Sequence, residues 1–491
     1  MPTEPTDLEQ YALELVNRLR LDPTGSFDRF IADAATGTAH DPGVTAALAW
    51  FFVDLDALAA QLGSLTAVAP LAWNGLLHDA AAGHNAAMQA ADEQSHQVEG
   101  EAPLGARVDA TGYLWTTLAE NVYAYSENPD HAHAGFVIDW GYDTGESTYD
   151  RAGGDGIQDP AGHRNALMSA NYSEIGIDWL ADSSGLTSVG PWLTTQVLGT
   201  AVFSGPKVLG VVYADADADG AYSMGEGAAA AISIAAGAPV AAQAAGGYSL
   251  DANIGVQRMA FSGGGLERDI ELDVTVVDRN VKIDVTADGF IASSGDVAVQ
   301  SWAAGLKALS HDGVELRGGH ADELIEGGRG DDDLFGGRGA DRIQGGKGFD
   351  TIWGGGFSDG LSGGTEGDEI HGGRGWDRIY GGQGDDQLYG DEGNDFLAGG
   401  AGRDRIEGGD GDDRLRGGRG ADTFVFDASD GTDRIEDWEA KDRINLRPAG
   451  VELADIMIGT SGDDAVLAFA ATTVIIENAA GIFSEADLLL A

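Results

Sequence analysis

Residues 372–389 read GGRGWDRIY-GGQGDDQLY, which is two consecutive copies of one nine-residue unit. Twelve such units follow one another from Gly318 to Val425 without an insertion. Eleven of them open with Gly-Gly, and the remaining one opens with Gly390-Asp391. The eighth position is Leu, Ile or Phe in all twelve. A period of nine excludes collagen, whose period is three, and predicts a stacked repeat.

The residue types within the unit predict a parallel β-roll. Glycine adopts the turn dihedrals that other residues avoid, and the eighth residue gives each short strand one inward apolar side chain. A disordered glycine-rich linker would have no reason to keep Leu or Ile at every ninth position. We therefore expect two units to form one turn of the roll over residues 318–426.

The sixth position of the unit is Asp in the last eleven copies. Stacked carboxylates repel one another, and a hard cation with oxygen ligands relieves that repulsion, Ca²⁺ more readily than Mg²⁺. The pattern resembles the RTX, or hemolysin-type, calcium-binding repeats. The pattern departs at Phe357 and Glu366, where the fourth-position Gly is expected, and in the first unit, which has Ala321 and Glu323. We expect the row to be broken or altered near residues 354–371. The predicted calcium ligands are Asp332, Asp341, Asp350, Asp377, Asp386, Asp395, Asp404, Asp413 and Asp422.

Residues 427–491 resemble the segments that follow RTX rolls. The stretches from Ala421 to Phe426, Asp433 to Trp438 and Asp442 to Leu446 resemble a roll cap, and the tail from Phe483 to Ala491 resembles an uncleaved C-terminal type I secretion signal. This resemblance implies a type I ABC exporter as a partner and an extracellular protein, with cell-surface association as an option.

Composition limits the classes of function. Lys+Arg 28 against Asp+Glu 81 gives a net charge of −53, which repels nucleic acids and anionic lipid headgroups. The chain has no Cys, so disulfides, zinc-thiolate sites and thiol catalysis are excluded. It has no run of 18 apolar residues, and its first residues lack the features of a cleavable signal peptide. We therefore expect no transmembrane segment and export without an N-terminal signal.

Residues 1–205 have a different pattern, with alanine-rich helical stretches and few Gly-Gly pairs. Apolar residues at helical spacing predict amphipathic helices over residues 9–21 and 76–88. Alternating patterns predict strands over residues 174–180 and 192–202. Helices that flank a small sheet are implied.

Four motifs in this region resemble the bacterial branch of the CAP superfamily, the SCP-like extracellular domain. They are Leu71-Ala72-Trp73-Asn74 with His84-Asn85-x-x-Met88, then Ser95-His96, then Ala119-Glu120-Asn121-Val122, and Gly162-His163-Arg164 followed by residues 171–177. The resemblance implies an α/β/α sandwich whose cleft carries two His and two acids. Three of these positions fall on His96, Glu120 and His163. The fourth acid follows Trp140, so Asp143 is the candidate and Asp139 the fallback.

Two imidazoles and two carboxylates can bind Zn²⁺ or another divalent ion, or act as general acid and base. They can also form a hydrogen-bonded polar cluster without catalytic activity. His78, His84, His131 and His133 have no acid at the family spacing, so we expect them to be structural or solvent-facing. No Gly-x-Ser-x-Gly elbow surrounds Ser95, which disfavours a serine hydrolase.

Residues 206–287 predict an antiparallel β-sandwich module. Between its first two strands, Asp215, Asp217, Asp219, Ser223 and Glu226 occupy positions 1, 3, 5, 9 and 12 of an EF-hand-like calcium loop, and Gly220 occupies position 6. The flanking strands resemble those of calcium-bearing B-type repeats in bacterial surface adhesins. Residues 288–317 are expected to form a short connector.

The predicted fold class is therefore multidomain, α+β and all-β: a CAP sandwich, a β-sandwich and a parallel β-roll. The predicted function is that of a secreted calcium-binding protein whose CAP domain binds a lipid, glycan or peptide outside the cell. The alternative is a metal-dependent extracellular hydrolase, a protease or esterase, that uses the His and Glu residues of the cleft. Because we find no oxyanion-hole motif and no His-Glu-x-x-His helix, binding is favoured over catalysis.

Overall fold

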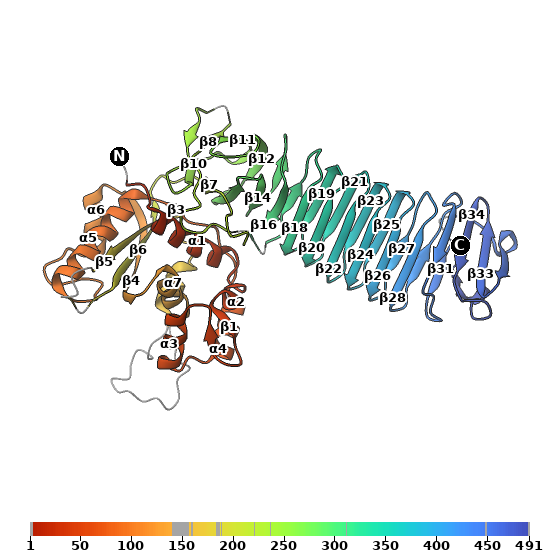
Figure 1. The fold of residues 1–491 in the computed structure, drawn as a ribbon, viewed down its shortest axis with the longest axis horizontal. Coiled ribbons are helices and arrows are strands. Elements are labelled where there is room, and N and C mark those ends of the chain that lie inside the picture. The colour runs from red at the N-terminus through yellow and green to blue at the C-terminus, as the bar shows by residue number, and fades with distance from the viewer. Residues whose placement is uncertain are drawn as a thin grey trace. The chain divides into compact units, whose positions relative to one another are not determined.

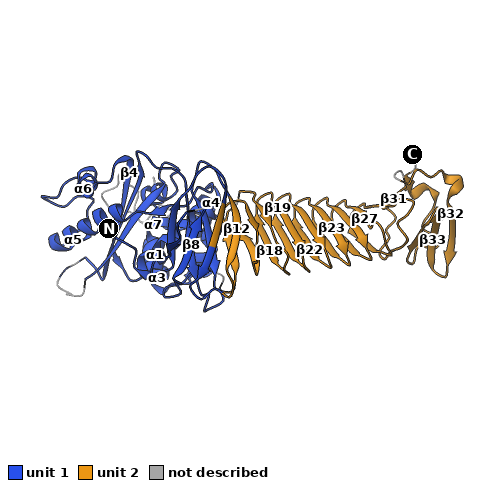
Figure 2. Cartoon of the chain, turned by 90° about the horizontal axis from the view of Figure 1, so that it is seen from above, with its two compact units in different colours: residues 1–257, 261–266, 275–287 blue, residues 258–260, 267–274, 288–491 orange. Residues whose placement is uncertain are grey.

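The structure, a computed structural model, describes residues 3–139, 157–158, 161–182, 187, 189–219, 221–235, 237–310, 312–446 and 449–489. The chain divides into two compact units (Figure 2). Unit 1 contains residues 1–257, 261–266 and 275–287, and unit 2 contains residues 258–260, 267–274 and 288–491.

The N-terminal part of unit 1 is a sheet covered by helices on both faces (Figure 1). The sheet order is β3-β5-β6-β4, with β3 at Ala72–Trp73, β5 at Glu174–Ala181, β6 at Trp192–Ala201 and β4 at Trp115–Ser126. One face is covered by α5 (Gly75–Ala91) and α6 (Leu104–Thr111). The other is covered by α1 (Asp7–Leu21), α7 (Pro129–Ile138) and α8 (Gly162–Leu167). This arrangement confirms the α/β/α sandwich.

Additional short elements lie on the α1 side of the sandwich. They are α2 (Ser26–Phe30), the hairpin β1 (Ile31–Asp33) and β2 (Thr38–Ala39), α3 (Pro42–Phe51) and α4 (Leu55–Gly63). Among the described residues, no single helix is long and apolar enough to cross a bilayer, although the sharply bent pair α3–α4 meets that test of length and composition.

Local capping explains where the two predicted helices begin. Thr6 and Glu9 form a capping box at the start of α1, and the Asn74 side chain accepts hydrogen bonds from the first backbone N–H groups of α5. Both helices are confirmed, and so are the strands predicted over residues 174–180 and 192–202.

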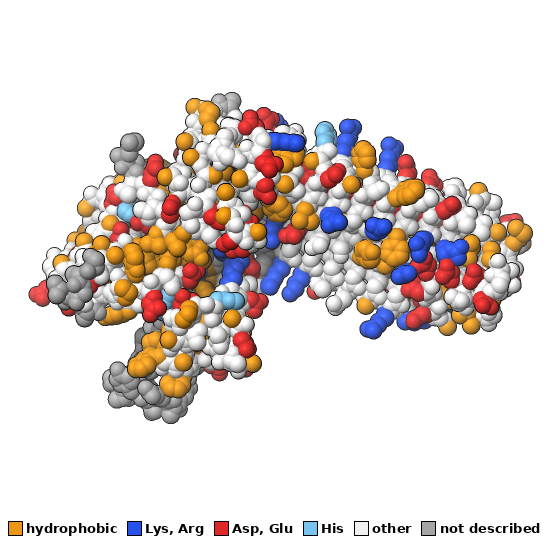
Figure 3. Space-filling view, viewed as in Figure 1, with side chains coloured by type: hydrophobic (Ala, Val, Ile, Leu, Met, Phe, Trp, Pro, Cys, Tyr) orange, Lys and Arg blue, Asp and Glu red, His pale blue; other side chains and the backbone are white. Residues whose placement is uncertain are grey.

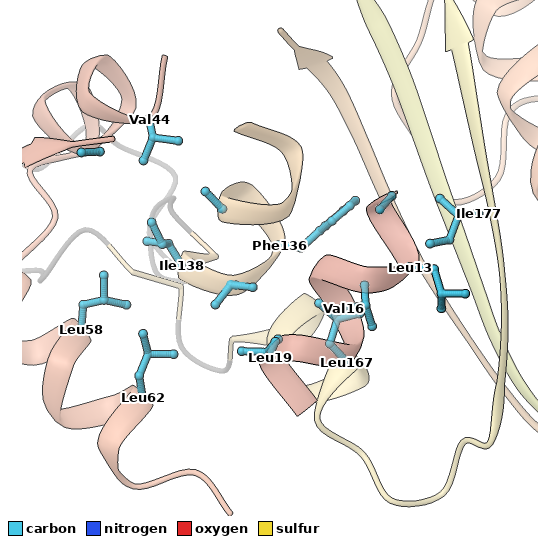
Figure 4. Close-up of a cluster of buried hydrophobic side chains, with 14 of the residues drawn as sticks. Leu13, Val16, Leu19, Val44, Leu58, Leu62, Phe136, Ile138, Leu167 and Ile177 are labelled. Atoms are coloured by element: carbon cyan, nitrogen blue, oxygen red, sulfur yellow. The ribbon is translucent and has the colours of Figure 1, made fainter. Parts of the chain in front are cut away.

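Apolar side chains fill both sides of the sheet. Figure 4 shows Leu13, Val16 and Leu19 of α1 beside Phe136 of α7 and Ile177 of β5. On β6, Leu198 joins this cluster while the adjacent Val197 joins the cluster under α5 and α6. Successive strand residues point to opposite faces, so one strand contributes to two cores.

The middle segment of unit 1 is made of strands. They are β7 (Lys207–Tyr213), β8 (Ala230–Ile234), β9 (Val240–Ala241), β10 (Gly247–Asp251), β11 (Gly255–Gly263), β12 (Ile270–Val276) and β13 (Val281–Thr286). Residues 258–260 of β11 and 270–274 of β12 are assigned to unit 2. The pairs β7–β10 and β8–β9 are antiparallel, as predicted. The prediction of a wholly antiparallel module is wrong for β7 and β13, which pair in parallel. A long excursion through β8–β12 separates these two strands, which allows the parallel arrangement.

A buried ion pair joins this segment to α1. The Lys282 ammonium of β13 lies 2.6 Å from the Glu14 carboxylate and also contacts Asp284. The side chains of Lys282 and Glu14 are only 2% and 3% exposed. Buried charges of this kind need their partners, so β13 and α1 depend on each other.

Unit 2 is a parallel β-roll with two stacks of strands (Figure 1). In one stack the register advances by 18 residues per strand, from Ile325 to Ile343 to Leu361. Two nonapeptides therefore make one turn, as predicted. The eighth-position side chains of all twelve units are at most 1% exposed and form the interior of the roll.

The strands of the first stack are β14 (Phe290–Ser293), β16 (Gly305–Ala308), β18 (Leu324–Arg329), β20 (Arg342–Lys347), β22 (Gly360–Thr365), β24 (Arg378–Gln383), β26 (Phe396–Ala401), β28 (Arg414–Arg419) and β30 (Thr432–Ile435). Those of the second are β15 (Val297–Val299), β17 (Glu315–Arg317), β19 (Asp333–Arg338), β21 (Thr351–Gly356), β23 (Glu369–Gly375), β25 (Gln387–Gly393), β27 (Arg405–Glu407), β29 (Thr423–Val425) and β31 (Arg443–Asn445).

Parallel stacking extends beyond the twelve units at both ends. It begins with the pairs β14–β16 and β15–β17, within residues 288–317. At the other end, β30 pairs with β34 (Thr472–Ile476), which continues antiparallel into β33 (Asp464–Phe469) and β32 (Met457–Ser461). The last strand, β35 (Leu488–Leu489), pairs with β31.

Candidate metal centres and cleft

The sixth-position Asp residues of the roll form a continuous buried row. Each is at most 3% exposed. The Oδ1 atom of each accepts a hydrogen bond from the backbone N–H of the residue 18 positions earlier, so that Asp341 N–H donates to Asp359 at 2.7 Å and Asp350 N–H to Asp368 at 2.9 Å. Because these Asp side chains are buried, the charged groups visible along unit 2 in Figure 3 belong to other residues.

The second oxygen of each carboxylate has a different environment. In the described part of the chain, the Oδ2 atoms of all eleven sixth-position Asp residues are buried without a hydrogen-bond partner. A buried carboxylate oxygen that lacks a donor is costly, and a hard cation would satisfy it. Burial raises the pKa of Asp332 to about 6, of Asp350 to about 7 and of Asp395 to about 8. The residues present therefore fit calcium.

The expected break near residues 354–371 is wrong. Phe357 and Glu366 adopt φ values of 86° and 74°, in the left-handed region that glycine occupies at the fourth position of other units. The backbone path is therefore kept, and Asp359 and Asp368 remain in the row. Asp391, in the second-position slot, likewise has a φ of 67°.

The row also extends to acids beyond the eleven sixth-position Asp residues. At its start, Glu323 N–H donates to Asp341, and Glu323 Oε2 is buried without a partner in the described structure. At its end, Asp413 and Asp422 donate to Asp433 and Asp442. The motif Asp-Arg-Ile at residues 433 and 442 repeats the unit, but these residues are 20 rather than 18 positions from their partners, which hides them from a strict period.

The EF-hand-like loop lies between β7 and β8. One carboxylate oxygen from each of Asp215, Asp217 and Asp219 lies within 4.8 Å of the others. The Glu226 carboxylate accepts hydrogen bonds of 2.8 Å from the N–H groups of Ala216 and Ser223. Burial and the two neighbouring Asp residues raise the pKa of Asp219. Gly220 lies outside the described residues, and the arrangement of the other acids fits a calcium loop.

The predicted cleft residues form two separate pairs. His96 Nδ1 lies 3.3 Å from Glu120 Oε2, and Arg107 donates to Glu120 Oε1 at 2.8 Å. His163 Nδ1 lies 2.7 Å from Asp139 Oδ1, and the His163 backbone N–H also donates to Asp139. The fallback acid is thus the one that contacts His163, and Asp143 lies outside the described residues.

These pairs do not converge on one ion-sized space. Among the described residues, the groups whose ligand atoms all lie within 4.8 Å of one another do not include His96, Glu120 and His163 together. A shared zinc ion at these three residues stays a prediction. Two histidines expected to be structural have acidic partners: His84 contacts Glu101 at 2.8 Å, and His78 contacts Glu9 at 3.1 Å. Sequence spacing missed them because neither acid lies on α5, the helix that carries both histidines.

His163 and Asp139 line a pocket of about 550 Å³. The described lining also includes the aromatic side chains of Trp50, Phe51, Tyr123 and Tyr125. An aromatic wall beside a few polar side chains is typical of small-molecule and peptide sites.

Comparison with known proteins agrees with this architecture. The model of the cysteine-rich secretory protein (CAP) family matches residues 13–197. The model of the RTX calcium-binding nonapeptide repeat matches residues 317–352, 353–388 and 389–424. No curated protein matches the chain.

Several solved structures are partly similar. An extracellular lipase, LipA from Serratia marcescens, shares 21% identity over 39% of this chain and 41% of its own, with a TM-score of 0.22. An extracellular SCP-domain protein from Bacillus anthracis shares 19% identity over 32% of this chain and 40% of its own, with a TM-score of 0.20. A subunit of the Azotobacter vinelandii mannuronan C5-epimerase shares 31% identity over 26% of this chain and 80% of its own, with a TM-score of 0.12. The chain spans about two fifths of the length of the first two proteins.

The buried carboxylate row, the α/β/α sandwich and the two family matches agree, so the chain carries a CAP domain at residues 13–197 and RTX calcium-binding repeats at residues 317–424.

Proposed function

We propose that this protein leaves the cell through a type I exporter, folds its roll on extracellular calcium, and presents a CAP domain that binds a lipid, glycan or peptide. The observation that carries the proposal is the row of buried Asp Oδ2 atoms without partners within the described residues. Extracellular calcium modules saturate at about 10⁻⁴ to 10⁻³ M. Calcium in the cytosol lies far below this range, so the roll would stay unfolded until export.

The aromatic pocket supports a binding role for the CAP domain. Trp50 is 63% exposed although it lines the pocket, and Tyr125 is 51% exposed. Exposed aromatic side chains beside a polar pair offer stacking and apolar contact together with hydrogen bonds. A sugar ring, an acyl chain or an apolar peptide side chain fits this chemistry.

The test compares the full chain with two matched variants in millimolar calcium. Binding of neutral phospholipid vesicles, oligosaccharides and apolar peptides is measured. The wild type is expected to bind one of these three classes. Trp50→Ala should weaken that binding about tenfold or more, as expected for an aromatic anchor. Trp376→Ala, which removes a 70% exposed Trp of the roll, should leave it unchanged. The proposal would be refuted if the wild type bound none of the three probes, or if Trp50→Ala bound the probe with the same affinity as the wild type.

One observation favours the alternative, a hydrolase. The His163–Asp139 contact of 2.7 Å has the geometry of an oriented general base, and it lines the same pocket. Under this alternative, the wild type hydrolyses casein or lipid esters and His163→Ala loses the activity. Equal turnover by both proteins would remove His163 from any catalytic role.

A further inference from the structure

Three side chains from three elements meet in unit 1, away from the cleft pairs described above. Glu9 belongs to the first turn of α1, His78 to the first turn of α5, and Asp178 to β5. His78 Nε2 lies 3.1 Å from Glu9 Oε1 and 3.7 Å from Asp178 Oδ1. The three atoms all lie within 4.8 Å of one another, so one small ion can contact them all.

The other oxygen of each carboxylate is held by a separate donor. Glu9 Oε2 accepts hydrogen bonds from the backbone N–H and the hydroxyl of Thr6, at 2.8 and 3.0 Å. Asp178 Oδ2 accepts from Asn85 Nδ2 at 2.7 Å, and Asn85 is itself held by the Thr195 hydroxyl. Each carboxylate therefore has a fixed orientation, with one oxygen turned toward His78 Nε2.

The imidazole is oriented in the way that metal ligands require. His78 Nδ1 lies 3.5 Å from Asp79 Oδ1, an atom that also accepts a 2.6 Å hydrogen bond from the Thr3 hydroxyl. A carboxylate at the far ring nitrogen is the usual partner of a metal-binding His, because it fixes the tautomer that leaves Nε2 free to coordinate.

The charge of the cluster also favours a divalent cation. Within the described chain, neither Glu9 nor Asp178 has a Lys or Arg partner within 4 Å. Two carboxylates with a neutral imidazole carry −2, which one divalent ion cancels. The side chains of Glu9, His78 and Asp178 are 5%, 11% and 15% exposed, so the cluster is largely shielded from solvent.

We propose that Glu9 Oε1, His78 Nε2 and Asp178 Oδ1 bind a divalent transition-metal ion of the zinc class. One imidazole nitrogen and two carboxylate oxygens match Zn²⁺, which uses three protein ligands and a water where a site keeps an open position. Calcium prefers oxygen ligands alone, so this site differs in chemistry from the roll and from the Asp215 loop. The competing arrangement is a protonated His78 that bridges two carboxylates without metal.

The experiment uses the full chain, stripped of metals and then saturated with calcium so that the oxygen sites are filled. Co²⁺ or Zn²⁺ is added alone, excess ion is removed by gel filtration, and the bound metal is measured by elemental analysis and by the visible absorption of cobalt. We expect one bound ion per chain. His78→Ala should lose it. Asn85→Ala, which removes the donor to Asp178 Oδ2 and also the hydrogen bonds of Asn85 to backbone carbonyls, should weaken it about 10- to 100-fold.

His40→Ala is the control, because His40 is exposed and lies outside the cluster. It should keep the ion, and so should His96→Ala and His163→Ala. Circular dichroism checks that each variant is folded, and Asp178→Asn, which keeps the shape of the side chain, replaces His78→Ala if the latter unfolds. No bound ion in the wild type would mean that the cluster is an ion pair only, and loss of the ion from His96→Ala but not from His78→Ala would place it in the cleft. Either result overturns the proposal.

Discussion

At the scale of single residues, environment decides what a carboxylate does. Asp385 and Asp386 are adjacent in the sequence, yet burial raises the pKa of Asp386 to about 6, while hydrogen bonds from Arg403 lower the pKa of the exposed Asp385. Only Asp386 belongs to the buried row. The same residue type is therefore a buried acid in the proposed calcium row at one position and a surface ion-pair partner at the next.

Replacing Glu226 tests the EF-hand-like loop. Binding to the folded form stabilises it by RT ln(1 + [L]/Kd), about 2.7 kcal/mol when calcium is at 100 times Kd. Glu226→Gln should remove most of this gain, because it removes the charged ligand at position 12. Thermal melting of unit 1 in the full chain, with and without millimolar calcium, measures the effect. Glu4→Gln, which alters an exposed acid, is the control, and an unchanged calcium response in Glu226→Gln would show that the loop is only an acidic hairpin.

Replacing Lys282 tests the buried ion pair. Lys282→Ala leaves Glu14 and Asp284 buried without their cation, and loss of one partner of such a pair costs about 3–5 kcal/mol. Arg29→Ala removes a solvent-exposed partner of Asp22 and should cost at most about 1 kcal/mol. Urea denaturation of unit 1 distinguishes the two. Equal losses would mean that the Lys282 pair is no stronger than a surface contact.

At the scale of the repeat element, the backbone keeps a similar conformation in units whose side chains differ. Gly339 and Gly375 have φ values of 125° and 158°, and Phe357 follows the same turn at 86°. Left-handed conformations cost non-glycine residues about 1–2 kcal/mol. The register of the neighbouring strands, which pairs Trp353 with His371, imposes this conformation on Phe357.

Phe357→Gly should therefore stabilise the calcium-loaded roll by about 1 kcal/mol, because glycine adopts a positive φ without strain. Phe349→Gly is the matched control: both Phe side chains are about two thirds exposed, but Phe349 does not have a positive φ. It should be neutral or destabilising. The melting temperature of unit 2 in calcium gives the answer, and a lower value for Phe357→Gly would contradict the strain argument.

The buried row also predicts a pH dependence for the calcium-free roll. Burial raises the pKa of Asp350 to about 7 and of Asp395 to about 8, against about 3.9 in an unfolded chain. Between these values the folded roll binds more protons than the unfolded chain, so its stability falls as pH rises. The contribution is fully present below about pH 4 and is lost as pH rises through about 7 to 8.

Circular dichroism in EDTA should therefore show more β-structure at about pH 5 than at about pH 8. Saturating calcium should restore the structure at the higher pH, and calcium affinity should weaken on acidification as protons compete for the carboxylates. A β-signal in EDTA that is constant or increases with pH would contradict burial of these acids.

At the scale of the whole molecule, the two units differ in what stabilises them. Unit 1 contains apolar cores on both sides of its sheet, whereas the interior of the roll contains one apolar side chain per nonapeptide beside a row of acids. We expect EDTA at neutral pH to remove the β-signal of the roll while the helical signal of unit 1 persists. A β-signature that survives EDTA unchanged would contradict calcium-dependent folding.

The sequence alone determined the roll and the sandwich. The period of nine, the apolar eighth residue and the buried Asp are local properties that repeat in every unit, so strand register and inward side chains follow from sequence spacing. The same holds for α1 and α5, whose caps and apolar periodicity lie within a few residues. It does not hold for the roll ends, where Asp433 and Asp442 depart from the period.

Only the tertiary structure decided which distant side chains meet. Phe357 and Glu366 keep the row intact because neighbouring strands hold their backbone. Asp139 contacts His163 because α7 ends beside α8. Glu9, His78 and Asp178 are separated by up to 169 residues, and no spacing in the sequence predicts that they lie together. They come together because both α1 and α5 contact β5, and this packing is not encoded in a linear pattern.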